Sequence, residues 1–237
     1  MASSPLGVLS SAPDPTAKVT RPMTFRDDSI LPAPPDGAVP VMHNREYRVQ
    51  SYRLSSDRLL IHGALRDQKP PGLFIPGDPE PLTIHHMMVS IEVSVPELEI
   101  LEARTEFRTH PNESCPAIVE HYDNLVGLSI RRGFTHKVRE LFGGPRGCSH
   151  TTALLQAMAP IAMQSLKGME SWEAMQTGAP HPIIDRPPGD DSWRRLVNTC
   201  HVWSEDGDRI EERRAGGVQT MVVIRRLEEL GGRPENA

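Results

Sequence analysis

The chain has 237 residues and a net charge of −5, with only 38% hydrophobic and 5% aromatic residues. This length accommodates one large domain or two small ones, and the negative charge argues against bulk attraction to nucleic acid. No apolar run approaches the roughly 20 residues that a membrane span needs, and the N-terminus lacks the pattern of a secretory signal. We therefore expect a cytoplasmic protein that binds neither nucleic acid nor a membrane.

The N-terminal segment differs in composition from the rest of the chain. Residues 1–41 contain eight prolines and almost no periodic apolar pattern. Such a segment lacks the backbone donors and the apolar surface that a folded element requires. We predict a disordered, proline-rich tail over 1–41 and a single α+β domain over 42–237.

Four segments in the first half carry the alternating, β-branched pattern of strands. They are residues 43–54, 57–65, 83–95 and 97–110. In the clearest of them, Val89, Ile91 and Val93 share one face by the two-residue period. A stretch rich in proline and glycine, residues 68–81, predicts a loop before this strand. We expect the last two strands to form an antiparallel hairpin with one face in water.

The period of the apolar residues changes to that of helices in the second half. Helices are predicted within 115–128, over 134–142 and over 148–166. Pro160 should kink or split the last of these, and residues 167–192 resemble a loop. Strands followed by helices predict an α+β fold, an antiparallel sheet with helices packed on one face.

The segment GGPRGCSH (143–150) is the most informative for chemistry. It predicts a tight glycine loop that runs into a helix start, where unpaired N–H groups favour a thiolate and an anionic ligand. We predict Cys148 and His150 as catalytic residues, with the histidine as a base for the thiol. Gly147 and Arg146 are the predicted cofactor-binding residues. The alternative is a buried structural cysteine beside a polar helix-capping histidine.

A metal site is a second use of these residues. His85 lies on the valine-bearing face of its predicted strand, so it is desolvated and needs a partner, whereas His86 points to the opposite face. Cys115 follows a strand at another predicted helix start. The predicted metal ligands are therefore His85, Cys115, Cys148 and His150, a set that suits zinc or iron. A backbone carbonyl is the alternative partner for the histidine.

Basic side chains gather before the glycine loop. Between residues 131 and 146, five lysines and arginines stand against one acid, Glu140. This local excess is suited to a carboxylate, phosphate or thioester substrate, and Arg146 shares the loop with the thiol. The alternative is a solvated helix face.

Residues from about 43 to 200 resemble an uncharacterised bacterial family, domain-of-unknown-function family 2889. The matching motifs are IHHM (84–87), P-x-x-x-C (111–115), NLVGLSIRRGF (124–134), GCSH (147–150) and NTCH (198–201). The chain is also distantly similar to the NifU-like iron–sulfur scaffold and the SufE-type sulfur acceptor, with a fold of strands followed by helices. This second resemblance implies that His85, Cys115 and Cys148 occupy ligand positions, with His150 beside them.

Three functions follow from these patterns. The first is a metal- or thiol-dependent enzyme that acts on a small anionic metabolite through Cys148 and His150. The second is a protein that handles sulfur or iron–sulfur cargo. The third is a non-catalytic binding domain in which the cysteines and histidines are merely buried.

Overall fold

The computed structural model describes residues 30–33, 35–38, 41–131, 133–185, 190–216 and 221–231. Most of the predicted disordered tail lies outside these residues. The chain divides into two compact units, one of Pro34–Glu173 and one of Met1–Ala33 with Ala174–Ala237. The single domain over 42–237 stays a prediction.

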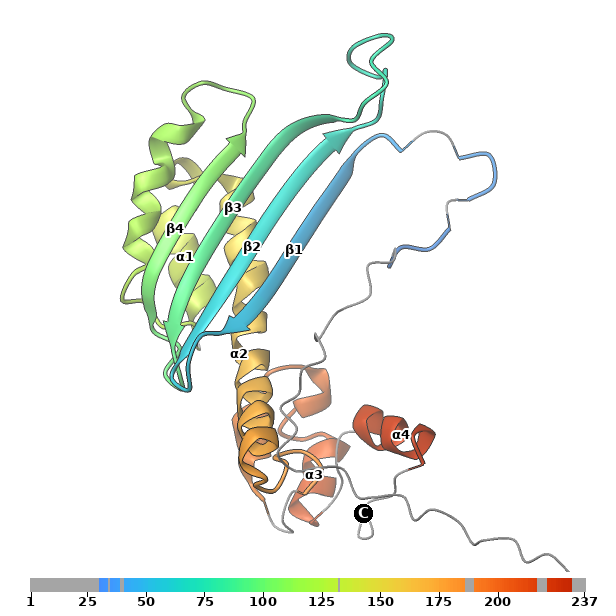
Figure 1. The fold of residues 1–237 in the computed structure, drawn as a ribbon, viewed down its shortest axis with the longest axis vertical. Coiled ribbons are helices and arrows are strands. Elements are labelled where there is room, and N and C mark those ends of the chain that lie inside the picture. Colours follow the sequence, from blue (N-terminus) through green and yellow to red (C-terminus); the bar gives the residue numbers. More distant parts are fainter. Residues whose placement is uncertain are drawn as a thin grey trace, which may run out of the picture. The chain divides into compact units, whose positions relative to one another are not determined.

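The first unit is built on a four-stranded antiparallel sheet of order β1-β2-β3-β4 (Figure 1). The strands are β1 (Asn44–Arg53), β2 (Arg58–Lys69), β3 (Leu82–Ser94) and β4 (Ile100–Thr109). All four predicted strands are therefore confirmed, within a few residues at each end. β1 and β4 are the edge strands of this sheet.

The two faces of the sheet differ because alternate side chains point to opposite sides. On β2 and β3, one set of alternate positions is buried and almost entirely apolar, as the pattern predicted. Its members are Leu59, Ile61, Gly63, Leu65, Asp67, Met87, Val89, Ile91 and Val93. The other set carries cross-strand ion pairs such as Arg58–Glu92 and Arg66–Glu46. The sheet therefore covers a core with one face and keeps the other in water.

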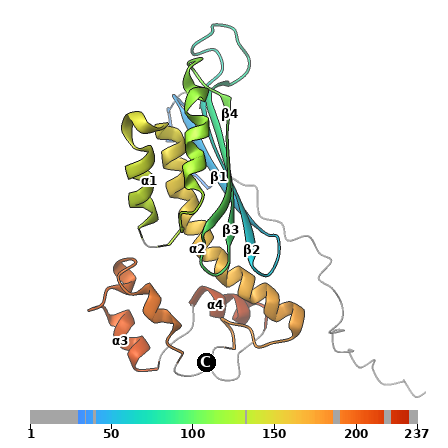
Figure 2. The same cartoon turned by 90° about the vertical axis from the view of Figure 1, so that its left-hand side faces the viewer.

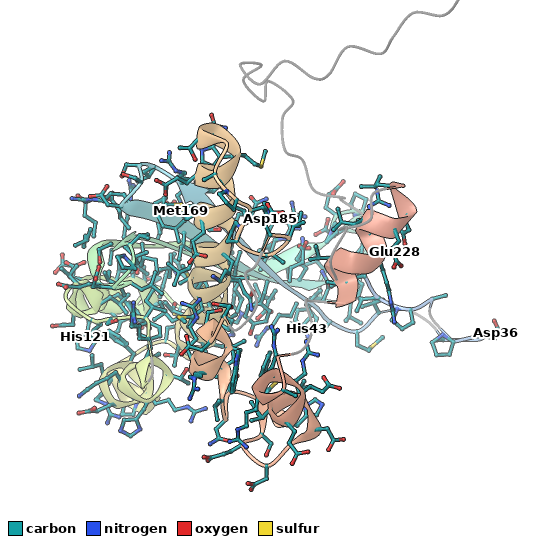
Figure 3. The ribbon with its side chains drawn as sticks, turned by 90° about the horizontal axis from the view of Figure 1, so that it is seen from below. Asp36, His43, His121, Met169, Asp185 and Glu228 are labelled. Atoms are coloured by element: carbon teal, nitrogen blue, oxygen red, sulfur yellow. The ribbon has the colours of Figure 1, made fainter. Side chains whose placement is uncertain are left out.

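Helices that follow the sheet along the chain cover its buried face, as Figure 2 shows. They are the 3₁₀ helices η1 (Cys115–Leu125) and η2 (Gly144–Arg146) and the α-helices α1 (Phe134–Phe142) and α2 (Ser149–Thr177). Apolar side chains of η1, α1 and α2 join those of the sheet in one core cluster. Figure 3 shows the side chains from below, with His121 of η1 and Met169 of α2 labelled. The α+β fold with helices on one sheet face is confirmed.

Helix α2 is longer than predicted. It runs without interruption through Pro160 to Thr177, so Pro160 does not split it, and the loop predicted from 167 onward is wrong for residues 167–177. Six of the eleven residues 167–177 are lysine, glutamate, methionine or alanine, which are strong helix formers. The extension also contributes to the core through the buried Met169.

The second unit contains four short helices among its described residues. They are η3 (Ser192–Leu196), η4 (His201–Trp203), α3 (Asp208–Arg214) and α4 (Met221–Glu229). Trp193 and Ile210 are buried, and Cys200 is exposed. Across both units, no described helix combines the length and the apolar character that a membrane crossing requires.

At Gly63, side chains of α2 pack directly against the backbone of β2. A Cβ atom at this position of β2 would lie 2.5 Å from Met158 Sδ and 3.2 Å from Leu154 Cδ1, both on α2. A larger side chain would have to push the helix outward or force Met158 into another rotamer. The glycine therefore sets the distance between the helix and the strands.

We expect Gly63→Val to lower the free energy of unfolding by about 1–3 kcal/mol, because it overpacks the contact between β2 and α2. Urea unfolding of the full chain measures this. The matched control is Ala64→Val, which adds volume at the next residue on the open face and should stay within about 0.5 kcal/mol of wild type. Equal losses in both variants would contradict this account of the packing.

Candidate metal centre

The sheet register places three polar residues side by side at one end of the buried face. Arg45 of β1 pairs with Asp67 of β2, and Asp67 pairs with His85 of β3. Asp67 continues the buried stripe of Leu59, Ile61, Gly63 and Leu65 by the two-residue period, so its carboxylate points toward the helices. The start of α2 adds His150 from the helical layer.

The Asp67 carboxylate is only 1% exposed and is the centre of this group. Arg45 binds it through both oxygens, with Nε 2.6 Å from Oδ1 and Nη2 2.6 Å from Oδ2. His85 Nδ1 lies 3.1 Å from Oδ2, and His150 Nε2 lies 3.4 Å from the same oxygen. His43 Nε2 lies 3.4 Å from Oδ1. Four basic side chains thus surround one buried acid.

Asp67, His85 and His150 have the arrangement of a metal-binding group. Each offers one ligand atom, and these atoms all lie within 4.8 Å of one another. The two imidazole rings are stacked, with centroids 3.8 Å apart and planes inclined by 29°. Within the described ranges, this is the one set of three histidine, cysteine or acidic side chains that meets this condition. One carboxylate and two imidazoles suit zinc or iron.

The surroundings keep Asp67 and His150 in the forms that bind metals. Burial alone would raise the pKa of Asp67, but the two hydrogen bonds and the charge of Arg45 lower that pKa to about 2. Burial, with the neighbouring His85 and Arg45, lowers the pKa of His150 below its usual 6.5. Near pH 7 the carboxylate is therefore ionised and the His150 ring is neutral.

Cys148 lies beside this group and not within it. Its Sγ is 3.7 Å from Nδ1 of His150, the ring nitrogen that faces away from Asp67. The backbone of Cys148 is held by the buried Tyr122, whose hydroxyl accepts a hydrogen bond from the Cys148 N–H at 2.7 Å. Burial raises the pKa of Tyr122 above its usual value, so the phenol stays protonated. The thiol is thus fixed next to one imidazole.

The glycine loop has a structural explanation. A Cβ on Gly147 would clash with the carbonyl oxygen of Phe142 and lie 3.0 Å from the Tyr122 hydroxyl, so only glycine fits. Arg146 donates from Nε to the carbonyl of Glu140 at 2.8 Å and from Nη2 to that of Arg139 at 3.3 Å. These are carbonyls of the last turns of α1. Cofactor binding by Gly147 and Arg146 stays a prediction.

The structure brings together two of the four predicted metal ligands, His85 and His150. Cys148 contacts His150, whereas Cys115, at the first residue of η1, does not belong to the group. His86 is on the opposite sheet face, as predicted. Sequence reasoning missed Asp67, although extending the alternation of β2 by one step past Leu65 would have placed an acid on the apolar face.

We expect the ion pair of Asp67 to stabilise the fold in a defined pH window. Because the folded pKa is about 2 and the usual value is 3.8, this stabilisation is complete above pH 3.8 and is lost as the pH falls toward 2. The shift corresponds to about 2 kcal/mol.

The measurement is the free energy of unfolding by urea at several pH values, for wild type and Asp67→Asn. The difference between the two proteins should shrink by about 2 kcal/mol between about pH 5 and pH 2, since the asparagine does not titrate. A difference that does not change with pH would show that Asp67 has no lowered pKa.

Comparison with known proteins identifies a family. No curated protein and no solved structure matches the chain, and the distant likeness to the NifU-like and SufE-type folds stays a prediction. Residues 43–164 match the family described as "Protein of unknown function (DUF2889)". The matched region contains His43, Arg45, Asp67, His85 and His150. Since it spans more than half of the chain, the chain belongs to the DUF2889 family.

Proposed function

We propose that this protein is an enzyme that binds one zinc or iron ion through Asp67, His85 and His150 and acts on a small anionic metabolite. The observation that carries the proposal is the convergence of a buried, ionised carboxylate and two imidazoles whose ligand atoms lie within 4.8 Å of one another. Three protein ligands are typical of catalytic zinc sites, which keep a further position for water or substrate.

The neighbouring residues have roles that follow from their contacts. Arg45 fixes the orientation of the Asp67 carboxylate through two hydrogen bonds, as partners of metal-binding acids commonly do. Cys148 lies at the other nitrogen of His150 and holds the orientation of that ring. An ion bound at this centre would polarise a substrate oxygen or activate water. His43, 39% exposed, lies beside the carboxylate on its solvent side.

We expect protein purified without a metal-affinity tag to contain close to one zinc or iron per chain. His85→Gln should weaken zinc binding by at least about 100-fold, because even loss of an outer partner of a ligand costs about 10–100-fold. Elemental analysis measures the metal content, and calorimetric titration of zinc into the full chain measures the affinity. His86→Gln is the matched control, since this neighbour points to the other sheet face and should bind zinc like wild type.

A second candidate function is supported by the contacts of His150. One ring nitrogen lies 3.7 Å from the Cys148 sulfur and the other lies 3.4 Å from the Asp67 carboxylate. Cysteine, histidine and acid in this order form an activated nucleophile in many enzymes. In a thiol-dependent enzyme, or in a protein that carries sulfur, Cys148 would hold the reacting group.

The rate of alkylation by iodoacetamide, measured at each cysteine by mass spectrometry, distinguishes the metal-dependent from the thiol-dependent function. A nucleophilic Cys148 should react faster than the exposed Cys200, and His150→Gln should slow Cys148 about tenfold or more while leaving Cys200 unchanged. Under the metal proposal, the half-buried Cys148 reacts more slowly than Cys200. Slow alkylation of Cys148 together with no bound metal would leave a non-catalytic binding domain as the remaining function.

A further inference from the structure

The group around Asp67 has a buried side and a solvent side. Asp67 is 1% exposed, and the side chains of His85 and His150 are each 19% exposed. Arg45 and His43 reach 38% and 39%. Arg45 lies on the edge strand β1, and His43 immediately precedes that strand. A ligand that arrives from water therefore meets Arg45 and His43 before it meets the carboxylate.

The charges at the centre do not cancel when a divalent ion is bound. Asp67 is the single acid among the ligands that the described part of the chain brings together. Its negative charge is already shared with Arg45, whose pKa Asp67 raises further above its usual value. A divalent ion would thus leave a net double positive charge beside a buried carboxylate. Charge in such a partly dry site is costly unless a counter-charge is present.

Arg45 has donors left for that counter-charge. Its guanidinium has five N–H donors. The two contacts with Asp67 use one on Nε and one on Nη2, and the Tyr47 side chain is a further hydrogen-bond partner, which still leaves N–H donors for a ligand. The planar fork of arginine matches carboxylate and phosphate oxygens, and hydrogen bonds between charged partners are about twice as strong as neutral ones. The start of the 29-residue helix α2 at Ser149 adds positive potential on the same side as His150.

We infer that Arg45 and His43 form an anion seat that binds a carboxylate or phosphate group of the substrate, while the same group or a neighbouring oxygen coordinates the metal. This inference rests on the proposed metal centre. The substrates expected are small acids that bind at the metal through their anionic group. Arg45 is then a specificity-determining residue as well as the partner of Asp67.

The test uses the full chain loaded with cobalt(II), whose visible absorption changes when a new ligand joins the metal. Oxalate and inorganic phosphate are the probes, and each is titrated into wild type and into Arg45→Gln at saturating cobalt. We expect Arg45→Gln to weaken anion binding at least tenfold and His43→Gln to weaken it several-fold. Arg45→Lys, which keeps the charge and loses the fork, should fall between wild type and Arg45→Gln.

The matched control is Arg48→Gln, which removes the same charge from β1 on the opposite face of the sheet and should bind both anions like wild type. If wild type binds no cobalt, the proposed metal centre fails. If cobalt binds but neither anion changes its spectrum, or if Arg45→Gln and Arg48→Gln bind alike, the anion seat is overturned and the metal centre stands. If the anions bind equally tightly without cobalt, the anion seat is also overturned, because the metal and Arg45 would then not bind the same anion.

Discussion

A carboxylate that is 1% exposed on an apolar sheet face is stable only while its charge is matched, and here Arg45 matches it with two hydrogen bonds of 2.6 Å. The rest of the centre is arranged around this pair. Because the arginine keeps Asp67 ionised, two imidazoles are able to converge on Oδ2. The pair also joins β1 to β2 through side chains, in addition to the backbone pairing of these strands.

His150 is the residue that both candidate functions need, and its two ring nitrogens face different partners. Nε2 faces the carboxylate and Nδ1 faces the Cys148 sulfur. A metal on Nε2 would interrupt the link from acid to thiol, so metal chemistry and a three-residue relay exclude each other at the same moment. With a metal on Nε2, the Cys148 thiol would serve only to hold the orientation of the His150 ring. The two proposed chemistries thus depend on different partners of one imidazole ring.

Much of the fold follows from local patterns in the sequence. The four strands and α1 were predicted because alternation and helical spacing are properties of short segments. The length of α2 was not predicted from the sequence. Residues 167–177 resemble a loop, but their strong helix formers and the burial of Met169 keep them helical. His85 and His150 were identified because each stands out locally, one on an apolar strand and one at a helix start.

Asp67 and Arg45 were missed because their importance depends on register. The predicted strand ended at residue 65, so Asp67 was left outside it. Its place between Arg45 and His85 becomes visible only when β1, β2 and β3 are aligned. Cys115 is the opposite case, since its similarity to Cys148 is local and the fold does not bring it into the group of Asp67, His85 and His150. Pairing between distant segments is the information that single-sequence patterns lack.

The position of Arg45 on an edge strand has a dynamic consequence. β1 is mostly exposed. Side chains such as Ser51, whose hydroxyl lies 2.7 Å from that of Ser165 on α2, and Glu46, which pairs with Arg66 of β2, add to its backbone pairing with β2. Detachment of β1 would remove Arg45 and leave the Asp67 carboxylate buried without its partner. Breaking a buried ion pair in this way typically costs about 3–5 kcal/mol. Local opening of this edge strand is therefore coupled to loss of the site, and any molecule that binds Arg45 should slow amide hydrogen exchange along β1.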